Sequence, residues 1–215
     1  MTVRIGIFGG TFNPPHFGHL RSALEAREIL GLTRVLFLPA GRHPFKREEV
    51  LAATHHRLAM TRLAIAHEPG FDLCRLEADQ EQTAYTSETL AAIGCRYPDA
   101  ELVFLFGADL LAEMHLWKDW QRLIALAHLV VLVRPGFQGA WATTDAGRHF
   151  ASRRVERPEE LQRQTDGHGF LVQPVTMLDI SATDLRARAL AGRSLRYLTP
   201  EAVVAYIDAH QLYRP

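Results

Sequence analysis

The chain has 215 residues, of which 47% are hydrophobic and 22% are charged, which is enough for one globular core. Lysine plus arginine and aspartate plus glutamate are 24 each, so the formal net charge is zero, and this excludes a general electrostatic attraction to nucleic acid or membranes. Cys74 and Cys95 have no C-x-x-C spacing and predict reduced, buried thiols. The longest apolar stretch, 124–133, is far shorter than the roughly 20 residues of a membrane helix. We therefore expect a soluble cytoplasmic protein without a signal peptide.

The first segment of the chain predicts a strand, a turn and a helix. Residues 5–8 form an apolar run that is typical of a buried strand in a parallel sheet. The pair Gly9-Gly10 favours a tight turn, and an amphipathic pattern from Leu20 to Leu30 predicts a helix. His16 and His19 lie between the turn and the helix. In an open α/β sheet ligands bind at such a turn, and the start of the helix favours an anion there.

Strand and helix patterns alternate along the remaining chain. Buried strands are predicted at 34–38, 71–74, 102–106, 129–133 and 170–173. Helices are predicted at 51–66, 85–95, 110–114, 120–126 and 184–191, and a last one opens with a capping Thr199 and Pro200 at its first position. This alternation predicts an α/β fold with a parallel sheet that has helices on both faces. We expect a single domain over residues 1–215 with a helical C-terminal part from about 181–215.

Two polar segments are interpreted as surface. Residues 136–169 are rich in arginine and glycine without a strong period, which predicts a surface excursion with one helix at 159–164. Its arginines are interpreted as a solvated face. The pair His55-His56 opens a helical pattern and is likewise interpreted as surface.

A longer motif surrounds the first histidines. Residues 9–20 read GGTFNPPHFGHL, which has neither the Gly-Lys-Ser/Thr of a P-loop nor the G-x-G-x-x-G of a dinucleotide site. The motif resembles the T/HxGH signature of the nucleotidyltransferase superfamily. Its longer form is similar to that of the bacterial nicotinate mononucleotide adenylyltransferases, whose usual text is GGTFDPxHxGHL. The resemblance implies a Rossmann-like, doubly wound parallel sheet.

A second motif lies near the other end of the chain. In isolation, Ser181 followed by Asp184 predicts a structural capping box. Arg186 belongs to the first turn of the same helix, so hydroxyls, free amides and a guanidinium can converge on one anion. Residues 180–186, ISATDLR, resemble the ISxTxxR signature of the same superfamily, which binds the triphosphate. The two motifs lie near opposite ends of the chain in the family's order, and the resemblance as a whole spans nearly the whole chain, from Ile5 to Tyr213.

The resemblance assigns roles to individual residues. It implies catalytic roles for His16, His19, Lys46 and Arg186. It implies ATP binding by Gly9, Gly10, Thr11, Phe12, His16, His19, Arg134, Ile180, Ser181, Thr183 and Arg186. It implies binding of the pyridine nucleotide by Tyr85, Thr86, Asp109, Trp117 and Lys118, with Tyr85 to Leu90 resembling the family's YTxxTL. The loop after the second strand departs from the family, because Phe45 stands at its histidine position and Ala40 at its asparagine position; His43 and Arg47 are alternative cations there.

The chemistry of nucleotidyl transfer agrees with this residue set. A phosphomonoester has a second pKa near 6, so the attacking oxygen needs no general base, and the protein must hold several negative charges in line. Both histidines can donate to phosphate oxygens, and a protonated imidazole would add charge; the structural alternative is that one caps the helix and the other packs. A zinc site lacks further ligands at a recognisable spacing.

We therefore expect adenylyl transfer from ATP to nicotinate mononucleotide, with Mg²⁺ as cofactor, to give deamido-NAD and pyrophosphate. One alternative is an enzyme of the same superfamily that uses phosphopantetheine or nicotinamide mononucleotide as acceptor. Another is a non-catalytic nucleotide-binding regulator. The expected partners are the two small substrates, with neither nucleic acid nor membrane. The sequence does not decide whether the protein forms a homo-oligomer.

Overall fold

The computed structural model describes residues 3–41, 51–80, 82–136, 140–161 and 167–214. Within these residues one seven-stranded parallel sheet has the order β3-β2-β1-β4-β5-β7-β6. The strands are β1 (Val3–Gly10), β2 (Arg34–Pro39), β3 (Phe71–Leu73), β4 (Ala100–Gly107), β5 (His128–Val133), β6 (Arg154–Val155) and β7 (Phe170–Pro174). The predicted Rossmann-like α/β fold is confirmed.

The strand order places a topological switch point between β1 and β4. β1 pairs with β2 on one side and with β4 on the other, so the chain winds away from β1 in both directions. The two loops that leave β1 and β4 therefore diverge at the carboxyl edge of the sheet and open a crevice, which is where ligands bind in such folds.

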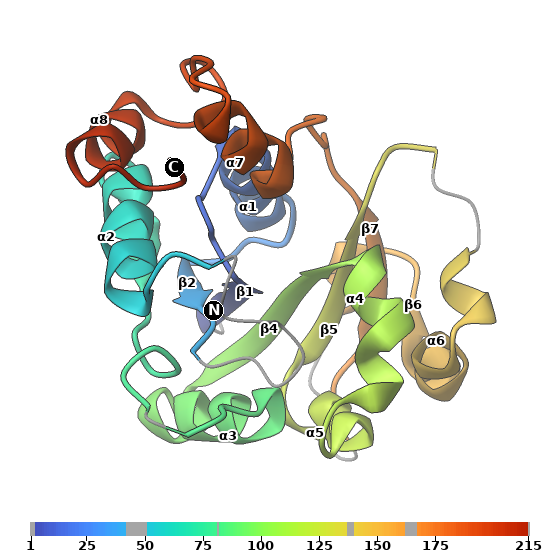
Figure 1. The fold of residues 1–215 in the computed structure, drawn as a ribbon. Coiled ribbons are helices and arrows are strands. Elements are labelled where there is room, and N and C mark those ends of the chain that lie inside the picture. Colours follow the sequence, from blue (N-terminus) through green and yellow to red (C-terminus); the bar gives the residue numbers. More distant parts are fainter. Residues whose placement is uncertain (1–2, 42–50, 81, 137–139, 162–166, 215) are drawn as a thin grey trace.

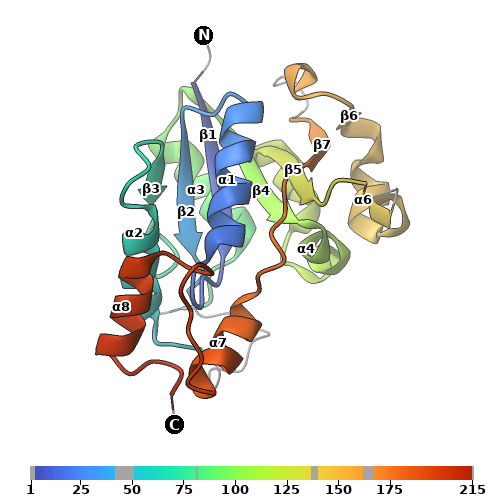
Figure 2. The ribbon, with the colours of Figure 1, turned by 90° about the horizontal axis from the view of Figure 1, so that it is seen from above.

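Helices cover both faces of the sheet (Figures 1 and 2). The helices are α1 (Phe17–Ile29), α2 (Thr54–Ile65), α3 (Thr86–Arg96), α4 (Ala108–Glu113), α5 (Leu123–Leu126), α6 (Asp145–Phe150), α7 (Ala182–Leu190) and α8 (Glu201–Ala209). On one face, Ala23 and Ala26 of α1 pack with Phe37 and Leu105 of the sheet. On the other face, side chains of α3, α4, α5 and α6 pack in a second cluster with the sheet. Both faces of the central strands are thus removed from water, which explains their continuous apolar runs.

A third apolar cluster joins α2, α7 and α8 beyond the edge of the sheet. Met60 of α2 packs with Leu185 of α7 and with Val203 and Ile207 of α8. Figures 1 and 2 both show α8 alongside α2. This cluster ties the C-terminal helices to the side of the molecule on which β1 ends.

The prediction for residues 136–169 was wrong over much of the segment. Helix α6 follows Thr144, whose hydroxyl accepts a hydrogen bond from Gly147 N at 2.9 Å, and it buries Phe150 in the core. Of the helix predicted at 159–164, the described part is a 3₁₀ turn, Pro158–Glu160, followed by a buried Leu161, and 162–166 lie outside the described residues. A capped, six-residue helix with one large apolar anchor is too short to give a periodic pattern.

Several local expectations also need correction. The predicted helix at 51–66 begins only at Thr54. Thr199 does not cap α8: its hydroxyl donates to Pro15 O at 2.8 Å, and Pro200 occupies the cap position. His56 is not simply a surface residue, because its Nδ1 lies 3.0 Å from the Tyr206 hydroxyl of α8. Cys74 and Cys95 are both free thiols, but Cys95 is exposed and not buried.

None of the helices in the described part of the chain is long and apolar enough to span a bilayer.

Candidate active site

A cavity of about 1040 Å³ lies at the carboxyl ends of β1 and β4, at the switch point of the sheet. Every predicted site residue that the structure describes lines it. From β1, the following turn and α1 come Gly9, Gly10, Thr11, Phe12, His16 and His19; from α3, α4 and the following turn come Tyr85, Thr86, Asp109, Trp117 and Lys118; from β5 onward come Arg134, Ile180, Ser181, Thr183 and Arg186. Lys46, with His43, Phe45 and Arg47, lies outside the described residues.

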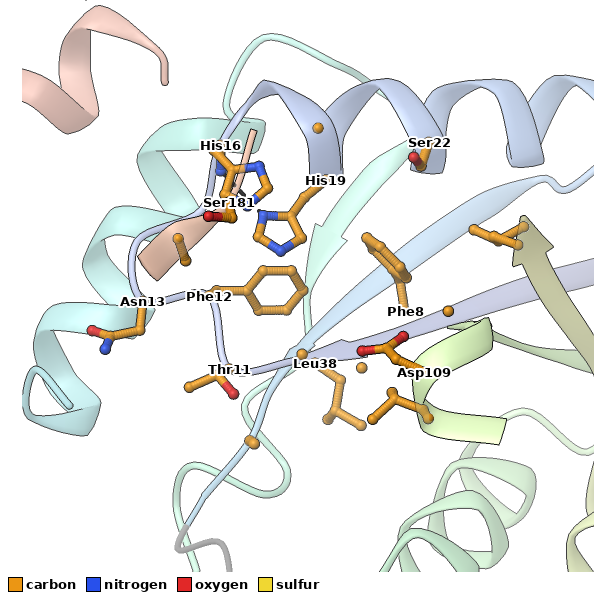
Figure 3. Close-up of a pocket in the computed structure, with 18 of the residues that line it drawn as sticks. Phe8, Thr11, Phe12, Asn13, His16, His19, Ser22, Leu38, Asp109 and Ser181 are labelled. Atoms are coloured by element: carbon orange, nitrogen blue, oxygen red, sulfur yellow. Dashed lines mark hydrogen bonds between the residues drawn. The ribbon is translucent and has the colours of Figure 1, made fainter. Parts of the chain in front are cut away.

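The two histidines form a stacked pair at the start of α1. Their ring centroids are 3.6 Å apart, and His16 is the N-cap residue of the helix. His19 Nδ1 accepts a hydrogen bond from the backbone N–H of His16 at 3.2 Å. Figure 3 shows the two rings side by side, with Phe12 next to His19. Both histidines therefore line the cavity, as the first prediction requires. They also take part in capping the helix, which was the structural alternative.

Both imidazoles are neutral before an anion binds. Burial lowers the pKa of His16 to about 4. Burial, together with the neighbouring His16, holds the pKa of His19 well below its usual value. The buried Nδ1 of His16 has no hydrogen-bond partner among the described residues. A buried, unpartnered ring nitrogen on a cavity wall is costly unless a ligand satisfies it. Both histidines thus present neutral hydrogen-bonding groups, rather than preformed cations, to the cavity.

The backbone around the histidines leaves little space for side chains. A Cβ on Gly18 would lie 3.0 Å from His16 Nδ1, so glycine lets the imidazole rest against the first turn of α1. Phe12 has a φ of 47°, a left-handed conformation that few large residues adopt. Its ring is buried and lies 5.2 Å from that of His19, edge to face. Phe12 therefore contributes to the site as the buried support of His19, while its backbone follows the cavity wall.

Helix α7 brings a second group of polar residues to the cavity. Ser181 caps the helix as predicted, with Oγ accepting from Asp184 N at 3.0 Å. Arg186 Nη2 donates to Thr183 Oγ1 at 3.1 Å, and its Nη1 donates to the backbone oxygen of Asn13 at 2.8 Å. The two motifs, more than 160 residues apart in the sequence, thus meet through a hydrogen bond between Arg186 and the loop that precedes the histidines.

The opposite wall of the cavity is aromatic. Trp117 packs edge to face against Phe104 of β4, with ring centroids 6.5 Å apart. Tyr85 is the N-cap residue of α3, and Thr86 is its first residue. Lys118 Nζ lies 4.4 Å from the centre of the Tyr85 ring and 2.7 Å from Glu88 Oε1. A flat heterocycle can stack against the tryptophan here, with a cation and a helix N-terminus nearby.

The remaining predicted residues border the cavity. Asp109, in the first turn of α4, is exposed and faces it from the end of β4 (Figure 3). Arg134 follows β5 and donates from Nη2 to Asp179 Oδ1 at 3.3 Å on the surface. Ile180 precedes the cap of α7. These positions allow contacts with hydroxyl groups and with a base at the rim of the cavity.

Some contacts beneath the cavity wall had no local sequence signal. Glu77 lines the cavity, and burial raises the pKa of its carboxyl group. Thr89 is 2% exposed and donates from Oγ1 to Glu77 Oε1 at 2.9 Å, so this threonine of the Tyr85–Leu90 motif acts beneath the surface of the cavity. Arg57 is also 2% exposed and donates from Nη1 to Thr11 O at 3.1 Å. Their partners are distant in sequence, which no helical pattern reveals.

The polar residues fit a magnesium ion that arrives with a nucleotide. No group of three or more His, Cys, Asp or Glu side chains in the described ranges could hold a metal by itself. The carboxylates on the cavity wall are Glu77 and Asp109. Mg²⁺ is commonly held by one or two carboxylates together with substrate phosphates, and Glu77 or Asp109 could supply one such group.

Comparison with known proteins agrees with these observations. The cytidylyltransferase-like family profile matches residues 7–188. A protein of Roseiflexus sp. (strain RS-1), named a probable nicotinate-nucleotide adenylyltransferase, is 43% identical over 210 residues, which cover 98% of each chain. A protein of the same name from Acidithiobacillus ferrooxidans is 40% identical over 208 residues, covering 97% of this chain and 94% of that protein.

Solved structures share the fold. The nicotinic acid mononucleotide adenylyltransferase of Plasmodium falciparum, in complex with NaAD, superposes with a TM-score of 0.76 at 16% identity, over 98% of this chain and 97% of that one. The same protein in complex with APC gives a TM-score of 0.74. The fold, the two motifs on one cavity and the full-length sequence similarity lead to one assignment. The chain belongs to the cytidylyltransferase-like family, within its nicotinate-nucleotide adenylyltransferases.

Proposed function

We propose that the protein transfers the adenylyl group of ATP to nicotinate mononucleotide, forming deamido-NAD and releasing pyrophosphate. The observation that carries this proposal is the convergence of three groups on one cavity: the stacked His16 and His19, the Ser181–Arg186 turn of α7, and the aromatic wall with Trp117. The names of the full-length relatives favour nicotinate mononucleotide over phosphopantetheine or nicotinamide mononucleotide as acceptor.

The phosphate of nicotinate mononucleotide supplies the nucleophile. One of its oxygens attacks the α-phosphorus of ATP, the new P–O bond forms in line, and the bond from the α-phosphorus to the bridging oxygen breaks. The second pKa of a phosphomonoester is near 6, so this oxygen is largely ionised at neutral pH. The protein therefore needs no general base, and its task is to align two anions and to stabilise the charge on the leaving pyrophosphate.

The triphosphate side of the site is assigned to α1 and α7. His19 donates from Nε2 to the transferring phosphate, and His16 contacts the same group from the N-cap position of α1. Arg186 holds the β- and γ-phosphates, with Ser181 and Thr183 at the start of α7. Lys46 is proposed as a further phosphate contact.

The acceptor side is assigned to the aromatic wall. Trp117 stacks on the pyridine ring, and the start of α3 at Tyr85 and Thr86 receives the nicotinate carboxylate. Asp109 accepts from ribose hydroxyls. Lys118 adds a positive charge beside the carboxylate.

Mg²⁺ is proposed as the cofactor that accompanies ATP. Asp109 and Glu77 are the carboxylates that would lie near it. When bound, it would neutralise phosphate charge. A cytoplasmic location is also proposed, supported by the two free cysteines.

The test is pyrophosphate release from ATP and Mg²⁺ with three acceptors in parallel: nicotinate mononucleotide, nicotinamide mononucleotide and phosphopantetheine. Release mainly with nicotinate mononucleotide is expected. Release mainly with another acceptor would leave the roles of His16, His19 and Arg186 intact and refute those of Thr86 and Trp117. ATP binding without release with any acceptor would refute the proposed reaction and favour a regulator.

A further inference from the structure

Asn13 is a buried junction between the two halves of the phosphate site. It is 1% exposed and lies in the loop between β1 and His16. Its backbone oxygen accepts from Arg186 Nη1 at 2.8 Å. Its side-chain oxygen accepts from Ala52 N at 3.1 Å and from the Tyr213 hydroxyl at 2.6 Å. Asn13 is among the residues that line the cavity, and Figure 3 shows its amide pointing away from His19.

Tyr213 reaches this junction from the far end of the sequence. It follows α8, packs against the cluster formed by α2, α7 and α8, and has a φ of 61°, which turns the chain back towards β1. Burial raises the pKa of Tyr213, although Arg186 and Arg57 nearby lower it, so the phenol remains protonated at neutral pH. It is therefore the donor in the hydrogen bond to Asn13.

The same loop is held from a second side. The buried Arg57 of α2 donates to Thr11 O at 3.1 Å, to Ala52 O at 3.2 Å and to Thr54 Oγ1 at 3.0 Å. Arg57 thus holds Thr11 and Tyr213 holds Asn13. The loop that contains these two residues in turn sets the position of His16 and of the Arg186 guanidinium. Since Asn13 O binds one end of that guanidinium, a displacement of Asn13 changes where Arg186 points.

We propose that Tyr213 is a positioning residue for the triphosphate site: its hydroxyl holds Asn13, and Asn13 holds Arg186 and the histidine loop. The inference rests on the proposed function, because it takes Arg186 as a ligand of the triphosphate. It predicts a specific kinetic effect from a residue that does not line the cavity among the described residues.

The matched control is Tyr206 on α8. Tyr206 packs in the same apolar cluster, and its hydroxyl lies 3.0 Å from Nδ1 of His56, which is not among the residues that line the cavity. Tyr213→Phe and Tyr206→Phe therefore each remove one hydroxyl and one hydrogen bond from the C-terminal part of the chain. Only the first bond leads to the cavity.

The experiment measures ATP affinity by calorimetry, steady-state kinetics for both substrates, and thermal unfolding of both variants. Tyr213→Phe is expected to weaken ATP binding and to lower kcat/KM for ATP by about tenfold, the usual weight of one buried hydrogen bond, with KM for nicotinate mononucleotide unchanged. Tyr206→Phe should leave all kinetic values within about twofold. In an Arg186→Ala background, Tyr213→Phe should have little further effect on ATP affinity, since the group it positions is gone.

Two results would overturn the proposal. One is a Tyr213→Phe variant that melts earlier but keeps the ATP affinity and kinetics of the parent, which would make the tyrosine purely structural. The other is an equal kinetic loss in both tyrosine variants. Absence of turnover in the parent protein would instead refute the proposed function, and the ATP affinities would still test the position of Arg186.

Discussion

The backbone N–H of His16 donates to His19 Nδ1 at 3.2 Å, and this bond fixes the protonation of the second ring. An accepting Nδ1 carries no proton, so the neutral ring of His19 carries its proton on Nε2. A protonated ring would set an N–H against the His16 N–H. The burial that keeps the pKa of His19 low acts in the same direction. The cavity is thus provided with a neutral, oriented donor.

Removal of this donor should affect the chemical step. His19→Ala is expected to lower kcat by about 10²- to 10³-fold, the usual cost of one donor aimed at a developing charge. His19→Gln should retain more activity than His19→Asn, because the glutamine amide nitrogen reaches the place of Nε2. The exposed His55 provides the control, and His55→Ala should turn over normally. Full turnover by His19→Ala in a pyrophosphate-release assay would refute the phosphate contact.

A second buried histidine should govern acid stability. His128 is 0% exposed, and its Nδ1 accepts from Gly169 N at 2.9 Å. Burial, assisted by His168 and Arg4, lowers its pKa to about 4, while Glu101 opposes the shift. The unfolded chain has the higher pKa and binds more protons between pH 6.5 and 4. The contribution of the neutral His128 to the free energy of unfolding is therefore complete above pH 6.5. On the order of 3 kcal/mol of it is lost as the pH falls to about 4.

The variant His128→Asn tests this relationship. Asparagine keeps an acceptor for Gly169 N but does not titrate, so the free energy of unfolding should change less between pH 7 and pH 4.5 than in the parent. Urea unfolding at the two pH values measures the change. His115→Asn, at an exposed site, should keep the parental dependence. An equal pH dependence in His128→Asn and the parent would contradict the assignment.

Trp117 should act on one substrate only. Its ring packs edge to face against Phe104 and borders the cavity, so Trp117→Ala should raise KM for nicotinate mononucleotide by about tenfold and leave KM for ATP unchanged. Trp117→Phe should raise KM for nicotinate mononucleotide by less, because it keeps an aromatic ring. Trp120 packs against Phe150 with a centroid distance of 5.7 Å and does not line the cavity, so Trp120→Phe is the control for general aromatic packing. A rise in KM for both substrates would place Trp117 in the scaffold instead.

The sequence predicts those parts of the protein that have local signals. The runs at 102–106 and 129–133 are buried strands because each residue must be apolar where both faces of a sheet are covered. The two turns that we propose to bind phosphate are identifiable because glycine, histidine and hydroxyl residues at fixed spacing meet a chemical need. The predicted cap at Ser181 follows from the same kind of local geometry.

The missed features depend on contacts between distant residues. Arg57 has the spacing of an ordinary helical surface residue, and only the fold places it against Thr11 O. Tyr213 meets Asn13 across 200 positions. The local preference of a threonine before proline predicts a cap at Thr199, whereas in the fold its hydroxyl donates to the buried Pro15 carbonyl. In each case the position of the side chain depends on a tertiary hydrogen bond, which no local pattern reveals.

Lys118 should set the preference for the acid over the amide substrate. The Glu88 carboxylate and the Tyr85 ring hold its ammonium group at the start of α3, and the Glu88 hydrogen bond raises its pKa, so it is charged at neutral pH. A nicotinate carboxylate bound there gains an attraction that a nicotinamide lacks. Because the pair is exposed, the gain is modest, and Lys118→Met should lower the ratio of kcat/KM for the two mononucleotides by about three- to fivefold.

Glu88→Gln provides the opposite test of the same group. Without the competing carboxylate, the Lys118 ammonium is released to the substrate, so the preference for nicotinate should rise rather than fall. Both shifts should shrink at high salt, since screening weakens exposed charges. Parallel assays of the parent and both variants with the two mononucleotides, at low and high salt, measure these ratios. A ratio that both variants leave unchanged would assign the discrimination to the backbone amides of Thr86 and its neighbours at the start of α3.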